Sequence, residues 1–412
     1  KIVRRRVNVN PKNTDLMSES MGVYRRDAKG GNSSLKFHRK GAGNSIDTPQ
    51  SERKVSQRES DAPQKGCVRM ADLIEINASR LSDIERNLAL KKLSSNPHTI
   101  NGVKNRSKLS FYEEMIGLLM FLFFPGCVIW CPVLMPVIAA FCFKKSLESA
   151  FVYLLVLALL TFFPHSKTSH FGNSPIFAIL FKYTSLSYAW EAPLDKKKSP
   201  YMFVCPPHGV LPVSNLLFLI GLPHIWGFEF HGLTTDAALR LPILRQIMLW
   251  VGCKPATRKS AKKILESGMS IGISPGGVSE IFDTNNNDEV IFIKERKGFV
   301  KLALMTGTPI VPSYCFGTTK LFSCWYGQGD FLRKLSRKVG FGVVLVWGRF
   351  GLPIIHRYPL TTVSGAPIFV PLEKQPSQKM IDEYHLLFLT ELKGLFDRNK
   401  AAYGWADKEL VI

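Results

Sequence analysis

The chain lacks the cysteine spacing of a disulfide-stapled or zinc-binding protein. Its eight cysteines include no C-x-x-C pair, and Cys127, Cys131 and Cys142 fall in strongly apolar sequence. Closely spaced cysteines are what a disulfide framework or a structural zinc site requires. We therefore expect neither of these, no metal ion, and a catalytic part in a reducing compartment.

Acidic residues are also scarce. The 412 residues contain 54 Lys and Arg against 32 Asp and Glu, which gives a net charge of +22 at pH 7. Such an excess suits nucleic acid or an anionic membrane surface. Because 46% of the residues are hydrophobic and gather in the apolar segments described below, the composition favours a membrane, and we expect no nucleic-acid partner.

Residues 1–110 have little hydrophobic periodicity and carry about half of the excess charge, with 23 basic and 11 acidic residues. A segment rich in Ser, Asn, Gly, Lys and Arg cannot bury a core, so we expect a disordered basic tail, with a short helix at residues 74–93. The tail is either a solvated arm or a lipid-binding segment. Because the sequence begins with Lys1 rather than Met, we expect the natural N-terminus to lie upstream.

Charge is absent from residues 115–143, and this run of 29 residues exceeds the roughly 20 that a helix needs to cross a bilayer. A second uncharged run covers residues 149–164, and basic residues flank the pair on both sides. By the positive-inside rule, both ends face the cytosol. We predict a membrane-embedded helical hairpin over residues 111–165. Lys144 and Lys145 at its tip fit a deep crossing poorly, so a monotopic insertion stays open, whereas position and length exclude a signal peptide.

Residues 166–412 alternate between short strand-like and helical patterns. The predicted strands are residues 201–205, 269–274, 309–316, 341–347 and 367–370, and the predicted helices are residues 239–251, 261–266, 298–305 and 379–399. This alternation predicts an α/β domain with a mostly parallel sheet and flanking helices. We expect the domain to face the cytosol.

The tripeptide Pro207-His208-Gly209 directly follows the predicted strand 201–205. The carboxyl edge of a parallel sheet is where α/β folds place their chemistry. A histidine there can accept a proton from a substrate hydroxyl near neutral pH. His208 is therefore a candidate general base.

A glycine-rich turn, Ser274-Pro275-Gly276-Gly277, follows the next predicted strand and precedes Glu280. Its N–H groups form a candidate oxyanion nest, and the carboxylate of Glu280 is a candidate partner of a strand-end histidine. A tight turn with a solvated glutamate is the alternative. The turn also matches G-x-S-x-G, but the residue after Ser274 is Pro275, which has no N–H for an oxyanion hole. This argues against a serine hydrolase.

His231 and Asp236 form an H-x4-D array like that of glycerolipid acyltransferases and compete with His208. The simpler interpretation, which we favour, makes them polar loop residues, with Asp236 as a helix N-cap. Candidate phosphate-binding cations are Arg245, within an apolar helix, and Arg296 and Lys297, at the start of another. Surface ion pairs would explain these cations equally well.

Taken in order, these segments resemble the type-2 diacylglycerol acyltransferase family, which includes monoacylglycerol and wax-alcohol acyltransferases, over about residues 115–405. In addition to the apolar hairpin, the matching pieces are Pro207-His208-Gly209, Pro242 with Arg245, Gly276-Gly277-x-x-Glu280, residues 296–303, Val311-Pro312, Phe316-Gly317, His385, and Lys400-x-x-Tyr403-Gly404. Pro206 stands where the family has His or Glu, and Thr318 where it often has an acidic residue. These departures bear on substrate preference more than on the reaction.

The resemblance implies a glycerolipid-acyltransferase-like domain that transfers an acyl group from acyl-CoA to a neutral lipid, with diacylglycerol as the expected acceptor. It also selects His208 as the general base, because His231 lies only 14 residues before Arg245. Glu280 is then expected to orient the imidazole ring. The implied oxyanion donors are the N–H groups of Gly209, Gly276 and Gly277, and the implied acyl-CoA-binding residues are Arg245, Arg296, Lys297, Gly298 and Phe299.

Several alternatives stay open. The acceptor can instead be a monoacylglycerol, a long-chain alcohol or a lysophospholipid, and a non-catalytic lipid-binding homologue would keep the same fold. We expect location in the endoplasmic reticulum membrane or on lipid droplets, acyl-CoA as a co-substrate without a further cofactor, and a chain that can form a homo-oligomer.

Overall fold

The computed structural model describes residues 66–72, 102–103, 106–124, 126–162, 174–277, 280, 289–325, 331–339 and 344–412. All of them fall in one compact unit, Ala62–Ile412. The helix predicted at residues 74–93 lies outside the described residues, as does most of the expected basic tail.

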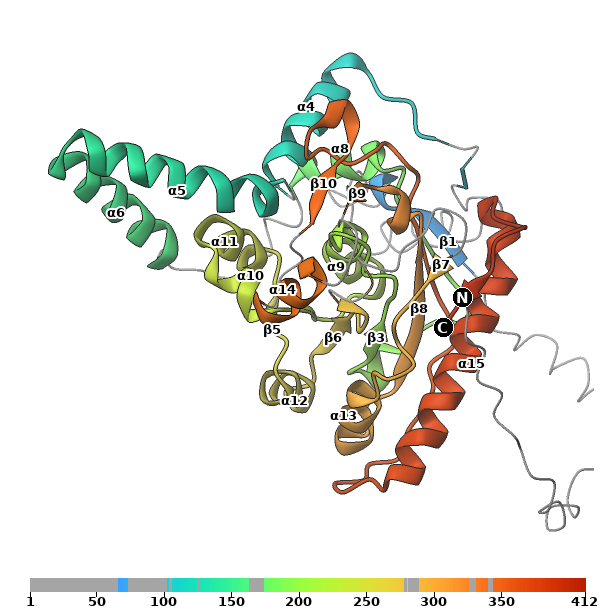
Figure 1. The fold of residues 1–412 in the computed structure, drawn as a ribbon. Coiled ribbons are helices and arrows are strands. Elements are labelled where there is room, and N and C mark those ends of the chain that lie inside the picture. The colour runs from blue at the N-terminus through green and yellow to red at the C-terminus, as the bar shows by residue number, and fades with distance from the viewer. Residues whose placement is uncertain are drawn as a thin grey trace, which may run out of the picture. The chain divides into compact units, whose positions relative to one another are not determined.

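Within the described residues, eight strands form one sheet in the order β1-β2-β11-β8-β3-β6-β4-β5 (Figure 1). Five of its seven pairings are parallel, and the β1–β2 and β11–β8 pairings are antiparallel. The predicted α/β class with a mostly parallel sheet is confirmed. The strands are β1 (Gly66–Arg69), β2 (Ser187–Trp190), β3 (Met202–Val204), β4 (Phe230–Thr234), β5 (Lys254–Pro255), β6 (Ser270–Ile273), β8 (Ile310–Phe316) and β11 (Thr361–Ser364).

Helices cover both faces of this sheet, and β3 shows how. Phe203 packs into one core with the residues of α9, whereas Met202 and Val204 point into a second core formed with α12, α13 and α15. The sequence of a strand buried on both faces is a continuous apolar run, and the sequence of β3 has this form. The helices are α4 (Phe111–Phe123), α5 (Cys127–Lys145), α6 (Leu147–Phe162), α8 (Pro175–Tyr183), α9 (Val213–Trp226), α10 (Asp236–Arg240), α11 (Pro242–Trp250), α12 (Arg258–Glu266), α13 (Gly298–Thr306), α14 (Phe331–Val339) and α15 (Gln378–Tyr403).

Most predicted elements are present. Strands 201–205, 269–274 and 309–316 correspond to β3, β6 and β8, and the four predicted helices correspond to α10 with α11, α12, α13 and α15. The strand predicted at residues 367–370 is wrong, because only Ile368 makes a bridge, to Ile310. Of residues 341–347, β10 (Leu345–Trp347) pairs with β9 (Ser323–Trp325) in a separate ribbon. A further pair joins β7 (Glu289–Val290) to β12 (Leu410–Val411).

Strand β11 has the polar sequence Thr-Thr-Val-Ser and was not predicted, although all four of its residues are buried. Its hydroxyl groups find partners on neighbouring strands. The Oγ atoms of Ser313 and Ser364 lie 2.7 Å apart, and Ser187 Oγ lies 2.8 Å from Thr361 Oγ1. Buried hydroxyls are tolerated when they are hydrogen-bonded in this way, so polarity alone misled the prediction.

Strand β1 corrects the expectation of a disordered tail over residues 1–110. It pairs with β2 along four residues, and Cys67 and Val68 are buried. Met70 follows and packs against Gly221, where a Cβ atom would lie 1.6 Å from the methionine methyl group. A four-residue strand inside a basic segment has too little periodicity to be recognised from sequence.

The apolar region forms three helices, α4, α5 and α6 (Figure 1). Ser146 alone separates α5 from α6, which pack side by side, and Tyr153 donates a hydrogen bond of 2.8 Å to the carbonyl of Met135. Among the described residues, one helical stretch, Phe111–Cys131, is long and apolar enough to cross a membrane. Insertion of residues 111–165 into a bilayer stays a prediction.

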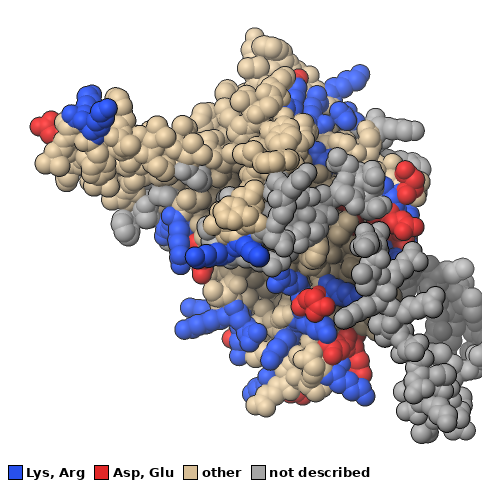
Figure 2. Space-filling model, viewed as in Figure 1, with Lys and Arg blue, Asp and Glu red and all other residues tan. Residues whose placement is uncertain are grey.

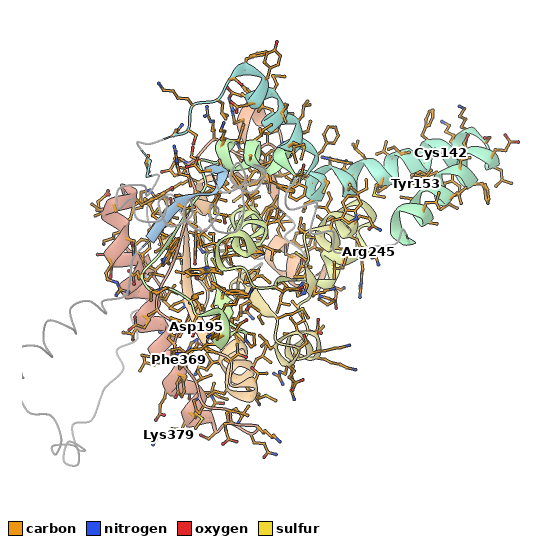
Figure 3. The ribbon with its side chains drawn as sticks, turned by 180° about the vertical axis from the view of Figure 1, so that it is seen from behind. Cys142, Tyr153, Asp195, Arg245, Phe369 and Lys379 are labelled. Carbon is orange, nitrogen blue, oxygen red and sulfur yellow. The ribbon has the colours of Figure 1, made fainter. Side chains whose placement is uncertain are left out.

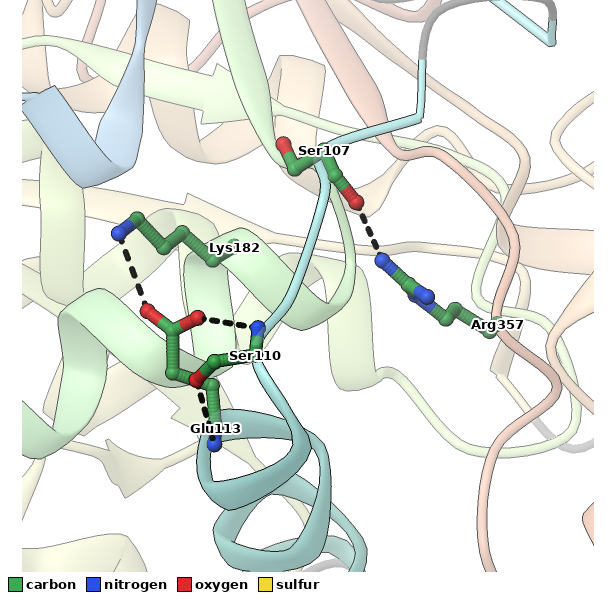
Figure 4. Close-up of polar contacts among 5 residues, drawn as sticks. All are labelled: Ser107, Ser110, Glu113, Lys182 and Arg357. Atoms are coloured by element: carbon green, nitrogen blue, oxygen red, sulfur yellow. Dashed lines mark hydrogen bonds and ion pairs between the residues drawn. The ribbon is translucent and has the colours of Figure 1, made fainter.

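The start of α4 is fixed to the rest of the domain (Figure 4). Ser110 and Glu113 form a capping box, in which each side chain accepts from the other residue's backbone N–H. Glu113 also pairs with Lys182 at 3.1 Å, and Arg357 donates to the carbonyl of Ser107. These contacts place α4 against α8.

Candidate active site

His208 lies at the carboxyl edge of the sheet, as predicted. It follows β3 by four residues, and β3 is flanked in parallel by β6 and β8. The strand end is held on both sides, because the Cys205 N–H donates to Ile273 and the Cys315 N–H donates to the Pro206 carbonyl, each at 2.9 Å. Gly209 then turns the chain with φ of +64°, a conformation that favours glycine.

The imidazole of His208 is half-buried, and its Nδ1 lies 2.9 Å from the carbonyl oxygen of Gly209. A carbonyl can only accept a hydrogen bond, so this contact assigns the proton to Nδ1 and leaves a lone pair on Nε2. Burial lowers the pKa of His208, and the hydrogen bond to the Gly209 carbonyl, a smaller effect, raises it. The neutral ring with a basic Nε2 is therefore the favoured form at neutral pH.

Glu280 reaches His208 through the backbone. Its Oε2 accepts the His208 N–H at 2.5 Å, and its Oε1 accepts the Phe292 N–H at 3.3 Å. Burial raises the pKa of this carboxyl to about 7, while the N–H groups of His208, Phe292 and Gly209 and the charge of Arg296 act in the opposite direction. Glu280 therefore contacts the main chain at residues 208 and 209, and orientation of the ring by Glu280 stays a prediction.

The turn glycines make room for this carboxylate. A Cβ atom at Gly276 would lie 1.7 Å from Glu280 Oε1, so no other residue fits without displacing it. Gly277 has φ of +59° and nothing within 4 Å of a built Cβ. The N–H of Gly209 interacts with Glu280. No described contact joins Glu280 to the N–H groups of Gly276 and Gly277, so these two glycines are the remaining oxyanion candidates.

His231 and Asp236, the pair that competes with His208, do not form a site with it. The prediction that both residues lie in a loop is wrong for His231. That residue lies on β4, is buried, and has Nδ1 2.8 Å from the Gly252 carbonyl. Asp236 is the first residue of α10, and Thr235 rather than Asp236 is the N-cap, accepting from Ala238 N–H. His231 therefore has the contacts of a structural residue.

The predicted cations do not gather in one cluster. Arg245 lies on α11, which packs against α5 and α6, and Figure 3 shows it beside the base of these helices. Arg296 is near enough to Glu280 to affect its carboxyl, and Lys297 pairs with Asp382 of α15 at 2.9 Å. The candidate phosphate-binding cations thus lie in separate parts of the domain, on α11 and at the start of α13 (Figure 1).

The other two predicted acyl-CoA-binding residues begin α13. Phe299 is buried and packs edge-on against Phe388 at 4.9 Å, so it joins α13 to α15 and is not accessible. Gly298 has open space where a Cβ would lie. Nearby, an open groove of about 500 Å³ runs along α15 and includes Lys294 and Lys393.

Sequence analysis missed a polar cluster beneath His208. The Sγ atoms of Cys205 and Cys315 lie 3.1 Å apart as free thiols, and Cys315 donates to the Oδ1 of Asn215 at 3.2 Å. Thr318 belongs to the same region, because its Oγ1 lies 2.7 Å from Ser214 Oγ. The pairing of β3 with β8 and the start of α9 bring these residues together across 100 to 110 positions, which no local spacing reveals.

A second buried carboxylate, Glu289, was also missed. It accepts hydrogen bonds from the hydroxyls of Tyr314 at 3.0 Å and Thr319 at 2.9 Å. Burial raises its pKa, and both hydroxyls oppose the shift. Its contacts support the end of β8. Among the residues that the structure describes, Glu280 and Glu289 are the two buried carboxylates, and of these Glu280 bonds to the His208 N–H.

Comparison with known proteins identifies the family. A family model described as diacylglycerol acyltransferase matches residues 146–412, which include every site residue above. The chain belongs to this family. It is therefore an acyltransferase of the diacylglycerol O-acyltransferase type, and the resemblance drawn from the motifs is confirmed.

Individual members of the diacylglycerol acyltransferase family agree. Diacylglycerol O-acyltransferase 2 of Dictyostelium discoideum is 32% identical over 262 residues, covering 59% of this chain and 78% of that protein. Diacylglycerol O-acyltransferase 2-like protein 6 of Homo sapiens is 32% identical over 240 residues, covering 52% of this chain and 71% of that protein. Diacylglycerol O-acyltransferase 1 of Eremothecium gossypii is 34% identical over 230 residues, covering 52% of this chain and 50% of that protein.

Among solved structures, the 1-acyl-sn-glycerophosphate acyltransferase PlsC of Thermotoga maritima is similar over 70% of this chain and 98% of its own. The TM-score is 0.35 and the identity 14%, a level of similarity that adds nothing to the family assignment.

Proposed function

We propose that this family member transfers the acyl group of acyl-CoA to the free hydroxyl of diacylglycerol, giving triacylglycerol, with His208 as the general base. The observation that carries the proposal is the contact between His208 Nδ1 and the Gly209 carbonyl, which leaves Nε2 unprotonated at the sheet edge. The names of the relatives, which are diacylglycerol O-acyltransferases, support this acceptor.

The reaction balances without another reagent. Nε2 of His208 takes the proton of the acceptor hydroxyl while its oxygen attacks the thioester carbonyl carbon. A new C–O bond forms, and the carbonyl oxygen becomes an oxyanion. When the tetrahedral intermediate collapses, the C–S bond breaks, and the CoA thiolate takes the proton from the imidazolium. The low pKa of His208 keeps the base neutral before each turnover.

Glu280 and the turn glycines complete the assignment. Glu280 holds the main chain of His208 and Gly209, whose carbonyl in turn holds the ring. Its negative charge also stabilises the imidazolium formed during transfer. The N–H groups of Gly276 and Gly277 are the proposed oxyanion donors, since backbone donors fixed in a turn need no reorganisation as charge develops.

Acyl-CoA phosphates are proposed to bind near the start of α13. Arg296 lies by Glu280, and Lys294 lines the groove along α15. Arg245 is assigned a lesser part, because its helix packs on α5 and α6 instead. Strong phosphate sites combine cations with a helix N-terminus, and α13 offers both.

We place the reaction at the cytosolic face of the endoplasmic reticulum membrane, with lipid droplets as a second location. Diacylglycerol and triacylglycerol are insoluble in water, whereas acyl-CoA arrives from the cytosol. The apolar helices α4 to α6 in the same chain as the site provide contact with the lipid phase. A homo-oligomer is compatible with this arrangement.

The test uses membranes from a host deficient in neutral lipid that expresses the full chain. Labelled acyl-CoA is supplied with diacylglycerol, monoacylglycerol, a long-chain alcohol or a lysophospholipid. We expect transfer to diacylglycerol to be fastest and His208→Ala to lower it by about 10²- to 10⁴-fold without loss from the membrane.

His231→Ala is the matched control, because it removes a second buried histidine that bonds to a backbone carbonyl. It is expected to reduce the amount of folded protein but to preserve activity per folded molecule. Undiminished transfer in His208→Ala would overturn the role of the base, and preference for another acceptor would overturn the substrate.

A further inference from the structure

The ribbon of β9 and β10 and the short helix η4 (Arg349–Gly351) expose apolar side chains rather than burying them. A two-stranded ribbon is marginally stable by itself and normally packs an apolar face. Here large side chains remain 39 to 72% exposed on what we call the ribbon face: Trp325, Leu345, Trp347, Phe350 and Leu352.

Phe350 is the most exposed of them, at 72%, and its backbone is unusual. It has φ of 59° and ψ of 20°, a left-handed conformation that aromatic residues rarely adopt. The turn around it is tied by hydrogen bonds of 2.8 Å from Gly348 N–H to Leu352 and from Arg349 N–H to Ile354. The fold therefore enforces a conformation that holds an aromatic ring outward, and such enforced outliers point to function.

Arg349 connects this turn to α4. Its Nη1 donates to Glu114 at 2.8 Å and to the Tyr183 hydroxyl at 3.0 Å, and its guanidinium lies 5.0 Å from the Phe350 ring centre. Figure 1 shows η4 beside α4. The ribbon face and the helix are consequently held as one surface.

Helix α4 continues the apolar surface. Its exposed residues include Phe111, Tyr112, Ile116, Leu119 and Phe123. In Figure 2, the surface over the neighbouring α5 and α6 is almost free of charged atoms except at their tip, whereas charges are frequent in the lower half. Contiguous apolar surface of this extent marks an interaction site.

The chemistry of the surface fits a lipid bilayer. Trp, Tyr, Phe and Leu are the side chains that settle at the headgroup level of membranes. Between β9 and β10 in the sequence, α14 combines Phe331, Leu332 and Leu335 with four basic residues and no acidic one, a pattern that suits lipid phosphates. The surface also continues the apolar helices proposed above to contact lipid.

We propose that the ribbon face, together with the exposed side of α4, docks on the membrane surface. The ribbon face then holds the domain to lipid at a second place, more than 150 residues after α6 in the sequence and in addition to the helices of residues 111–165. This goes beyond the proposed acyl transfer and rests on it only for the activity measurement below.

Photocrosslinking in phosphatidylcholine vesicles tests the contact. The full chain carries p-benzoylphenylalanine at position 350, at position 151 on α6, or at position 369. Phe369 is 57% exposed but lies far from the hairpin, near Lys379 (Figure 3). We expect labelled lipid to attach at 350 at least about tenfold more than at 369.

Labelling at 350 no greater than at 369 overturns the proposal, and so does attachment of another protein chain at 350 instead of lipid. If 151 is labelled and 350 is not, docking of the ribbon face fails alone. If neither is labelled, the membrane location of the proposed function fails as well.

A substitution adds a readout that a structural role would not give. Phe350→Asn removes the ring and introduces a residue that tolerates the left-handed conformation. We expect a slightly higher melting temperature together with about tenfold slower acylation of diacylglycerol in vesicles, a tenfold change being what loss of one partly buried ring produces. Phe369→Asn is the control and should leave vesicle activity unchanged. A melting temperature and activity that fall together in Phe350→Asn would contradict the proposal.

Discussion

At the end of β3 the carboxylate of Glu280 is 1% exposed, while on α6 the ring of Phe151 is 66% exposed. The two regions depart from ordinary burial in opposite directions. The candidate site buries polar groups and satisfies them with backbone N–H donors, and α4 to α6 leave apolar groups uncovered. A buried charge without partners and an apolar surface in water are both unfavourable, so each region indicates what it must contact. One requires fixed hydrogen bonds, and the other requires a covering surface, which we propose to be lipid.

The largest expected effect concerns the exposed region. Phe151→Asp with Leu155→Asp should lower membrane retention strongly, because each Asp within a membrane helix is unfavourable by about 2.5–3.5 kcal/mol. The control is Leu386→Asp with Leu387→Asp on α15, where exposure is 65% and 43%, close to the 66% and 47% of the first pair. Flotation of membranes followed by immunoblotting measures the result. Equal retention of both variants would show that α6 does not contact lipid.

The next effect breaks the buried region. Gly276→Ala should lower acyl transfer by about 100-fold or more, because its methyl group takes the position of Glu280 Oε1 and releases His208. Gly298→Ala is the control when acyl-CoA is saturating, because nothing lies within 4 Å of its Cβ position and a weaker phosphate contact there would raise KM rather than lower the saturated rate. Initial rates of acyl transfer per folded protein give the comparison. Similar losses of activity in both variants would show that Gly276 has no special role in the site.

Glu280→Gln should lower activity by about tenfold and change its pH dependence. In the natural chain the carboxyl with pKa of about 7 must ionise to accept its three N–H donors, so activity falls as pH drops through about 7. In Glu280→Gln, the pKa of His208, which burial lowers, sets the acid limb of the pH–rate profile. This limb should therefore move below pH 6.5. A pH–rate profile from 5 to 9 measures this, and an unmoved limb would contradict the assignment.

The same substitution has a stability consequence of known sign. The folded pKa of Glu280, about 7, exceeds the ordinary glutamate pKa of 4.5, so the folded state binds more protons between these values. Its contribution to stability is present below pH 4.5 and is lost as pH rises to about 7. Melting temperatures in detergent should therefore fall over this range in the natural chain relative to Glu280→Gln.

The smallest effect concerns the half-exposed pair Lys297–Asp382. Such pairs contribute about 0–1 kcal/mol, so neither Lys297→Ala nor Asp382→Ala should change the melting temperature measurably. If Lys297 binds phosphate, its loss should raise the KM for acyl-CoA about threefold, whereas Asp382→Ala should not raise it. Equal KM values in both variants would make the pair purely structural.

Sequence reasoning reached the fold class, the core strands and the placing of His208 and Glu280, because these follow from apolar runs and from residues at strand ends. It did not reach the contact by which Glu280 bonds to the backbone of His208, since spacing does not show which atom a carboxylate touches. It also missed Cys315 beside Cys205 and the buried hydroxyls of β11. Those contacts depend on strand order, which pairs residues 51 to 174 positions apart, and local patterns do not contain that order.

Strand β1 has a practical consequence for shortening the chain. Residues 66–69 occupy the outer side of β2, and Met70 fills the space beside Gly221. Removal of all residues before α4 as a dispensable extension would leave β2 with a row of unpaired N–H and C=O groups and an open apolar slot. Unpaired edges of this kind attract other strands and promote aggregation. A shortened protein that begins before Gly66 would keep β2 paired and the space beside Gly221 filled.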